Sequence, residues 1–175
     1  MPQFRSMINR RLIRIKIFQS LFGEFDGSET SATHIKKSVK KSIRDMEQNL
    51  LAVLSFGPEL AHFISTDHNP TDYKFNTSLE DVKSFRIFTE NSFFETLAND
   101  EKISNYLSKP KLSWSQEKEI LFIIYKEIKK SKEYEDIIAS DLNSNDFFTF
   151  SRFMYKYLIL NSVAVSYTHL TLPTN

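Results

Sequence analysis

The chain has 175 residues, 41% of them hydrophobic and 14% aromatic, so it can bury one sizeable core and a single globular unit is expected. The lack of cysteine excludes a disulfide framework, thiolate metal sites and a cysteine nucleophile. No apolar run reaches membrane-spanning length, and the opening MPQFRSMINRR lacks the apolar stretch of a secretion signal, so we expect a cytoplasmic protein without membrane contact.

The net charge of +1 is unevenly distributed along the chain. Residues 1–44 contain ten Lys and Arg against three Asp and Glu, whereas residues 45–175 contain thirteen against nineteen. A basic first quarter followed by an acidic remainder indicates a positive surface directed at a polyanion.

The first helix is predicted over residues 8–22. One face repeats every three or four residues and is expected to be core: Ile8, Leu12, Ile15, Gln19 and Phe22. Beside it, Arg10, Arg11 and Arg14 share one arc of about 100° at the amino end. Cations are mildly unfavourable there, because this end carries the positive pole of the helix dipole, so the arrangement favours an anionic ligand.

A second helix is expected from about residue 32. Gly57-Pro58 should stop or kink it, and residues 65–78, dense in turn formers, should form a long loop. Its outward face is basic and consists of Lys36, Lys37, Lys40, Lys41 and Arg44. Such a face is usually only solvated, and its alternative role is to extend an RNA-binding surface.

Further helices are expected over residues 79–98, 102–107, from Ser113 onward, over 134–138, and after the capping region at 141–144. Trp114 is expected to be a packing anchor, and the sixteen phenylalanines are assigned to the core. The predicted fold class is therefore an all-α multi-helix bundle.

No enzyme site is recognisable. The sequence shows no nucleophile paired with a base, no carboxylate pair and no glycine-rich cofactor loop, so we expect no catalytic residues and no cofactor. His62, Asp67 and His68 lack ligand spacing and are expected to lie on a loop surface rather than to bind a metal.

Residues 162–175 differ in character from the rest of the chain. From Tyr157 to Asn175 there is no charged side chain, and the segment favours strand over helix. It resembles a translated adaptor sequence, so we expect a non-native tail; the alternative is a native strand, which would lack a partner in an all-helical chain.

The opening stretch also resembles a known family. Arg10-Arg11, then Arg14, then Gln19-Ser20-Leu21-Phe22 is similar to the first helix of NusB-type transcription antitermination factors. The resemblance implies an all-helical fold whose arginine-rich amino end contributes to binding single-stranded boxA-type RNA. It also implies a partner, the small-subunit ribosomal protein NusE, in transcription elongation complexes. Arg10, Arg11 and Arg14 match the motif as RNA contacts, whereas Lys16 matches no defining position and is implied only as nearby charge.

The resemblance is close over about residues 8–25 and loose to about residue 161. The family's carboxy-terminal signature, an Ala-containing helix with a Glu followed by a Phe-Val-Asn-Gly-like run, is missing. We therefore expect residues 1–161 to be the amino-terminal portion of a longer NusB-like domain, incomplete at its carboxy terminus. In such a portion Phe147, Phe150 and Met154 should be partly uncovered.

Two other functions remain open. NusB-like domains also occur as RNA-binding appendages of RNA methyltransferases, and a helical protein-interaction module without RNA affinity is the simplest rival. On that last hypothesis the arginines are ordinary solvent-exposed side chains, a solvated rim, that pair with Glu24 or with acidic residues of the second half.

Overall fold

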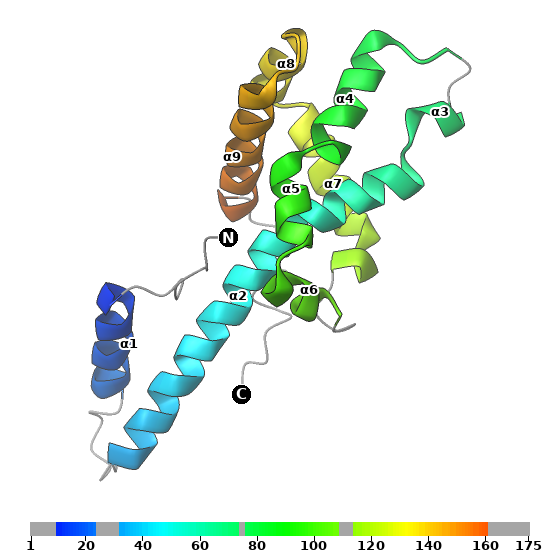
Figure 1. The fold of residues 1–175 in the computed structure, drawn as a ribbon. Coiled ribbons are helices and arrows are strands. Elements are labelled where there is room, and N and C mark those ends of the chain that lie inside the picture. Colours follow the sequence, from blue (N-terminus) through cyan, green and yellow to red (C-terminus); the bar gives the residue numbers. More distant parts are fainter. Residues whose placement is uncertain (1–9, 24–31, 74–75, 109–113, 161–175) are drawn as a thin grey trace. The chain divides into compact units, whose positions relative to one another are not determined.

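The computed structural model describes residues 10–23, 32–73, 76–108 and 114–160, and the predicted tail over residues 162–175 lies outside them. Within these ranges the regular structure is entirely helical, which confirms the all-α fold class (Figure 1). The chain divides into two compact units, residues 1–50 and 51–175, where the sequence led us to expect one domain over residues 1–161.

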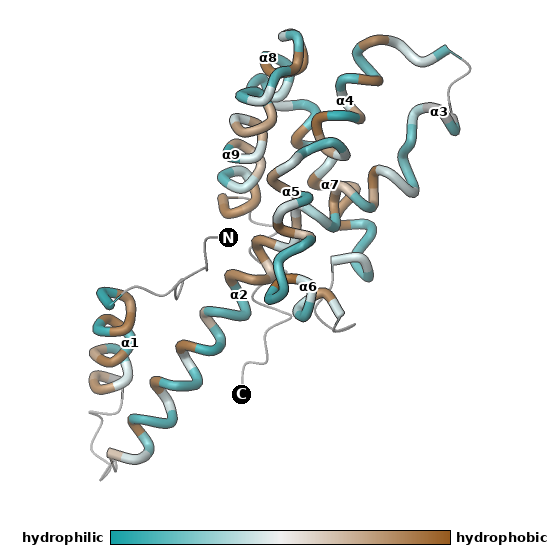
Figure 2. The backbone as a smooth tube through the Cα atoms, in the orientation of Figure 1, coloured by the Kyte–Doolittle hydropathy of each residue, from teal (hydrophilic) through white to brown (hydrophobic). Residues whose placement is uncertain are grey.

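The first unit contains α1 (Arg10–Gly23) and the beginning of α2 (Ala32–Asp67). The expectation that one face of α1 is core is wrong, because Leu12 is 37% exposed, Ile15 41% and Phe22 69%. Ile8 lies outside the described residues. Apolar residues recur around the whole of α1 (Figure 2), and a unit with only two described helical segments cannot cover them all.

The long helix α2 does not stop at Gly57-Pro58 but continues to Asp67. Pro58 has no N–H with which to bond the carbonyl of Leu54. The hydroxyl of Tyr155 donates to that carbonyl instead, at 2.7 Å, so the helix loses little by containing a proline.

The long loop expected over residues 65–78 is also shorter than predicted. After α2 ends, α3 (Pro70–Tyr73) begins with proline, which is well suited to the first position of a helix. α4 (Leu79–Thr89) is then capped by Ser78, whose side chain forms a reciprocal capping box with Asp81.

The single helix expected over residues 79–98 is two helices, α4 and α5 (Ser92–Ala98). Asn91 separates them: its side-chain oxygen accepts from the N–H of Phe93, and its amide donates to Ser151 at 3.0 Å. Asn91 is 2% exposed, so a buried polar side chain ends one helix and begins the next. α6 (Glu101–Leu107) follows, close to the predicted range.

The helix expected from Ser113 begins later, and Ser113 itself lies outside the described residues. A 3₁₀ turn, η2 (Trp114–Gln116), precedes α7 (Lys118–Lys129). Trp114 is confirmed as a packing anchor, because it is 1% exposed and its indole N–H donates to the carbonyl of Ala52 at 2.7 Å.

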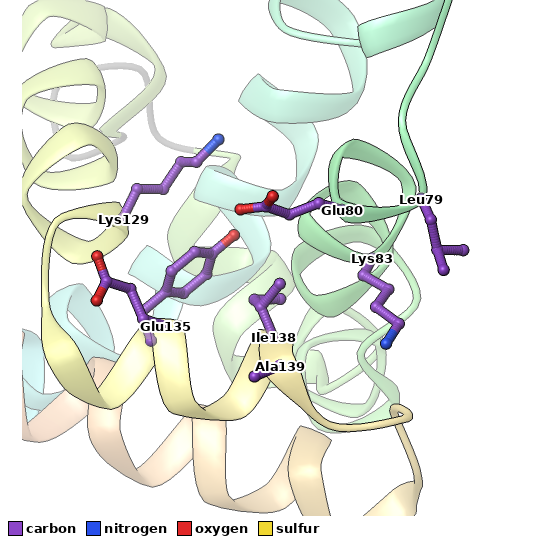
Figure 3. Close-up of a pocket in the computed structure, with 8 residues that line it drawn as sticks. Leu79, Glu80, Lys83, Lys129, Glu135, Ile138 and Ala139 are labelled. Atoms are coloured by element: carbon purple, nitrogen blue, oxygen red, sulfur yellow. The ribbon is translucent and has the colours of Figure 1, made fainter.

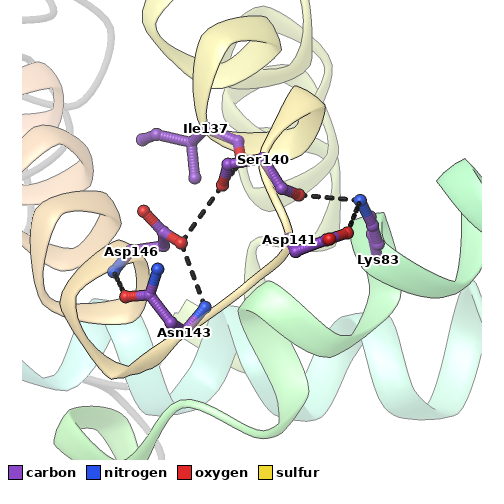
Figure 4. A network of polar contacts seen from close by, with 6 residues as sticks. All are labelled: Lys83, Ile137, Ser140, Asp141, Asn143 and Asp146. Atoms are coloured by element: carbon purple, nitrogen blue, oxygen red, sulfur yellow. Dashed lines mark hydrogen bonds and ion pairs between the residues drawn. The ribbon is translucent and has the colours of Figure 1, made fainter.

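The last two helices are α8 (Lys132–Ala139) and α9 (Ser144–Leu160). The predicted capping region lies between them (Figure 4): the side chain of Asn143 accepts from the N–H of Asp146, and the side chain of Asp146 accepts from the N–H of Asn143. Lys83 holds the same connection against α4 by donating to the carbonyl of Ser140 at 2.7 Å.

The second unit contains a continuous core. Its largest fully buried side chains come from α2, η2, α4, α7 and α9, among them Trp114, Phe56, Phe88, Leu60, Leu121, Ile124, Phe150 and Met154. Phe150 and Met154 are 0% exposed, so the expectation that they would be uncovered is wrong, and Phe147 is half-buried.

Candidate nucleic-acid interface

The three motif arginines lie in the first two turns of α1. Arg10, Arg11 and Arg14 are exposed, and Lys16 is half-buried. No carboxylate of the described residues forms an ion pair with these four side chains. Glu24, the partner considered in the sequence analysis, lies outside the described residues. Because α1 contains no acidic residue, the positive charges at its amino end are not offset within the helix.

The basic face of α2 forms a second positive surface in the same unit. A cavity of about 380 Å³ is lined by His34, Lys37, Ser38, Lys41 and Arg44. At 100° per residue these positions span about 120° of the helix surface, because each lies three or four residues from another member of the set. The structure therefore groups Lys37 and Lys41 with His34 and Arg44, and leaves Lys36 and Lys40 exposed outside the cavity.

Sequence reasoning missed His34 and Ser38 as members of this site, whereas it placed Arg44 on the basic face together with Lys37 and Lys41. The helical spacing of these residues is a sufficient signal in retrospect. Each residue is a hydrogen-bond donor, which an anionic oxygen requires.

Cations of the second unit are placed differently. Ion pairs between its described residues join Lys83 with Asp141, Arg86 with Glu90, Lys118 with Asp67 and Lys130 with Glu127. Lys118 and Asp67 approach within 2.6 Å, and that hydrogen bond lowers the pKa of the Asp67 carboxyl. Within the part of the chain that the structure describes, the first unit thus leaves its lysines and arginines available, whereas the second unit neutralises several of its own.

A cavity of about 520 Å³ in the second unit has mixed charge (Figure 3). Lys129 and Glu135 line one side of it, and Glu80 and Lys83 of α4 line the other. Tyr134 is buried there, with its hydroxyl oxygen 2.6 Å from that of Ser84, and burial raises its pKa. Because its charges alternate in sign, this cavity lacks the uniform positive potential that attracts a polyanion.

His68 is not on a loop surface as expected. It is half-buried, and its ring stacks on Phe122 with centroids 5.1 Å apart and meets Phe63 at 4.8 Å. In the described ranges, no three His, Cys, Asp or Glu side chains gather in a way that could hold a metal ion.

None of the helices within the described ranges is both long enough and apolar enough to cross a bilayer. No protein-family model matches the chain, and neither a curated protein nor a solved structure matches it.

Proposed function

We propose that this protein binds single-stranded RNA through the basic surface of its first unit, with Arg10, Arg11 and Arg14 as the main contacts. The observation that supports the proposal is the exposure of three arginines in two turns of a helix that contains no carboxylate. A guanidinium group grips phosphate with two parallel donors and also stacks on unpaired bases, which suits single-stranded RNA better than an ammonium group does.

The cavity on α2 extends this proposed surface. Lys37, Lys41 and Arg44 add three cations, and none of them forms an ion pair with another described residue. Phosphate contacts of this kind supply affinity and position the strand, but they do not read its sequence.

The resemblance of residues 8–25 to NusB-type factors gives the proposal its finer form. On that basis the RNA is of the boxA type, and the protein acts with NusE in transcription elongation complexes as an antitermination factor. By this resemblance Arg10, Arg11 and Arg14 are assigned as RNA contacts, and Lys16, which is half-buried, is assigned a weaker role.

The test is a titration of the full chain with a fluorescent single-stranded RNA at several salt concentrations. Three phosphate contacts contribute a slope of about −2 to the plot of log affinity against log salt, because each contact releases counterions. The triple variant Arg10→Ala, Arg11→Ala, Arg14→Ala should bind more weakly and lose about that much slope. Far-UV circular dichroism should show that it remains helical.

A matched control removes the same charge from the second unit by Lys118→Ala, Lys130→Ala and Lys132→Ala. We expect this control to keep most of the affinity and the salt slope. If the two triple variants behave alike, the arginines are a solvated rim and the proposal fails. Loss of RNA affinity with unchanged binding to NusE-type protein would favour RNA contact, whereas retained RNA affinity would favour the protein-interaction module.

A further inference from the structure

A groove of about 640 Å³ lies in the second unit, along one face of α9 and against α5 and α2. Its lining includes three phenylalanines and three charged side chains: Phe93, Phe148, Phe153, Arg152, Lys156 and Glu133. All of these residues belong to the second unit, whereas the basic surface described above belongs to the first.

Two of the aromatic rings are unusually open to solvent. Phe148 is 57% exposed and Phe93 39%, whereas the neighbouring Phe94 and Phe150 are 2% and 0% exposed. Phe93 is held edge-on against Tyr155, with ring centroids 6.0 Å apart. The core thus fixes the position of the groove, while two rings of its wall remain able to accept a planar ligand.

The charges of the groove differ from those of the unit around it. Residues 51–175 contain thirteen Lys and Arg against seventeen Asp and Glu, yet the described lining has two cations and one carboxylate. Arg152 and Lys156 are one helical turn apart, about 6 Å along the axis of α9. Among the described residues neither forms an ion pair, even with Glu133.

Exposed rings beside unpaired cations match the chemistry of an unpaired nucleotide strand. We propose that this groove binds single-stranded RNA, with bases stacked on Phe148 and Phe93 and with Arg152 and Lys156 on the adjacent phosphates. Stacking on aromatic side chains next to a positive groove is how proteins hold single strands without reading their sequence. This inference rests on the proposed RNA-binding function and assigns it a second contact region.

The experiment compares two probes on the full chain: a fluorescent single-stranded oligoribonucleotide, and an abasic oligomer with the same length and number of phosphates. Phe148→Ala should weaken binding of the oligoribonucleotide about tenfold or more, because base stacking is lost, and should leave binding of the abasic oligomer unchanged. Phe93→Leu should act in the same direction. The control is Ile159→Ala, which removes another exposed side chain of α9, 58% exposed, that does not line the groove.

The charge-neutralising pair Arg152→Gln and Lys156→Gln should weaken binding of both probes and flatten the salt slope by about 1.4. Circular dichroism checks that each variant stays folded. If Phe148→Ala changes the affinities of the two probes equally, or changes neither, the stacking proposal is overturned.

The outcomes separate this inference from the α1 proposal. If the α1 arginine variant keeps its RNA affinity while Phe148→Ala loses it, the α1 site fails and the groove stands. The opposite pattern rejects the groove and keeps α1. If Phe148→Ala leaves RNA binding intact but abolishes binding of an acidic, Phe-containing peptide, the groove is a protein-docking site and the inference is overturned.

Discussion

Gly57 lies inside α2 at a point where two rings approach its backbone. A Cβ atom built there would be 2.5 Å from the hydroxyl oxygen of Tyr155 and 2.7 Å from Cδ1 of Phe94. Neither distance is compatible with van der Waals packing, and Phe94 is buried, so it has little room to move.

We therefore expect Gly57→Ala to destabilise the protein by about 1–3 kcal/mol through overpacking, although alanine is the better helix former. Urea denaturation of the variant and the native chain measures the difference. In a Tyr155→Phe background the cost should be smaller, because the oxygen nearest the new methyl group is gone. An alanine variant as stable as the native chain would show that the close approach is not rigid.

The environment of His68 predicts that the stability of the folded protein depends on pH. Burial lowers the pKa of its imidazole, and the nearby Lys126 and Lys129 act in the same direction, against the opposing charge of Asp67. The folded protein thus favours the neutral ring. This preference stabilises the folded state fully when the pH is above the pKa of His68 in the unfolded chain, about 6.5. The stabilisation is lost as the pH falls from there through the lower pKa of His68 in the folded protein.

The free energy of unfolding, measured by urea denaturation at several pH values, should therefore decrease from pH 8 to pH 5. His68→Phe keeps an aromatic ring in the stack with Phe122 and removes the titration, so its profile should be flatter. His62→Gln changes an exposed imidazole in α2 and is the control. A His68→Phe profile parallel to that of the native protein would contradict the prediction.

Among the elements, α2 depends on a side chain that is remote in sequence. Tyr155, 101 positions after Leu54, supplies the hydrogen bond that Pro58 cannot donate. Burial raises the pKa of Tyr155, so its hydroxyl stays protonated and able to donate at ordinary pH.

Tyr155→Phe should cost about 1–3 kcal/mol, because it leaves the Leu54 carbonyl without this donor. Tyr157→Phe on the same helix is the matched control. Pro58→Ala restores a backbone N–H, so Tyr155→Phe should cost less in that background, as a double-mutant cycle by thermal or urea denaturation would measure. Equal costs in both backgrounds would mean that the hydroxyl does not compensate for the proline.

The same elements show where sequence reasoning succeeds. Helices at residues 102–107, 134–138 and after 144 are recognisable because local capping and helical spacing agree. The continuity through Pro58 is not recognisable, since it depends on Tyr155, which is distant in the chain. The break at Asn91 has a local capping bond from Phe93, but its burial against Ser151 is a long-range feature.

At the scale of the whole molecule, the core belongs to one unit. Every residue of the buried cluster lies between Phe56 and Leu158, whereas the large apolar residues of α1 are exposed, except for the half-buried Ile13. The two units therefore differ in how much apolar surface they bury, and hence in how much they contribute to cooperative unfolding.

A chain of residues 48–175 should accordingly keep a cooperative thermal transition, with a midpoint within a few degrees of that of the full chain. Circular dichroism at 222 nm and calorimetry on both proteins provide the measurement. A shift of about 4–8 °C corresponds to about 1 kcal/mol in a small domain, so a larger loss would show that residues 1–47 stabilise the core. Such a result would contradict the independence of the second unit.

The sequence alone determined the helical class, the basic character of the first unit and the motif arginines, because composition, charge and 3.6-residue periodicity are local properties. Only the tertiary structure decided which cations are paired, that most apolar residues of α1 are exposed, that His68 lies within an aromatic stack, and that Phe93 and Phe148 share a groove. Pairing and burial arise between residues far apart in the chain, and no local pattern specifies which of them meet.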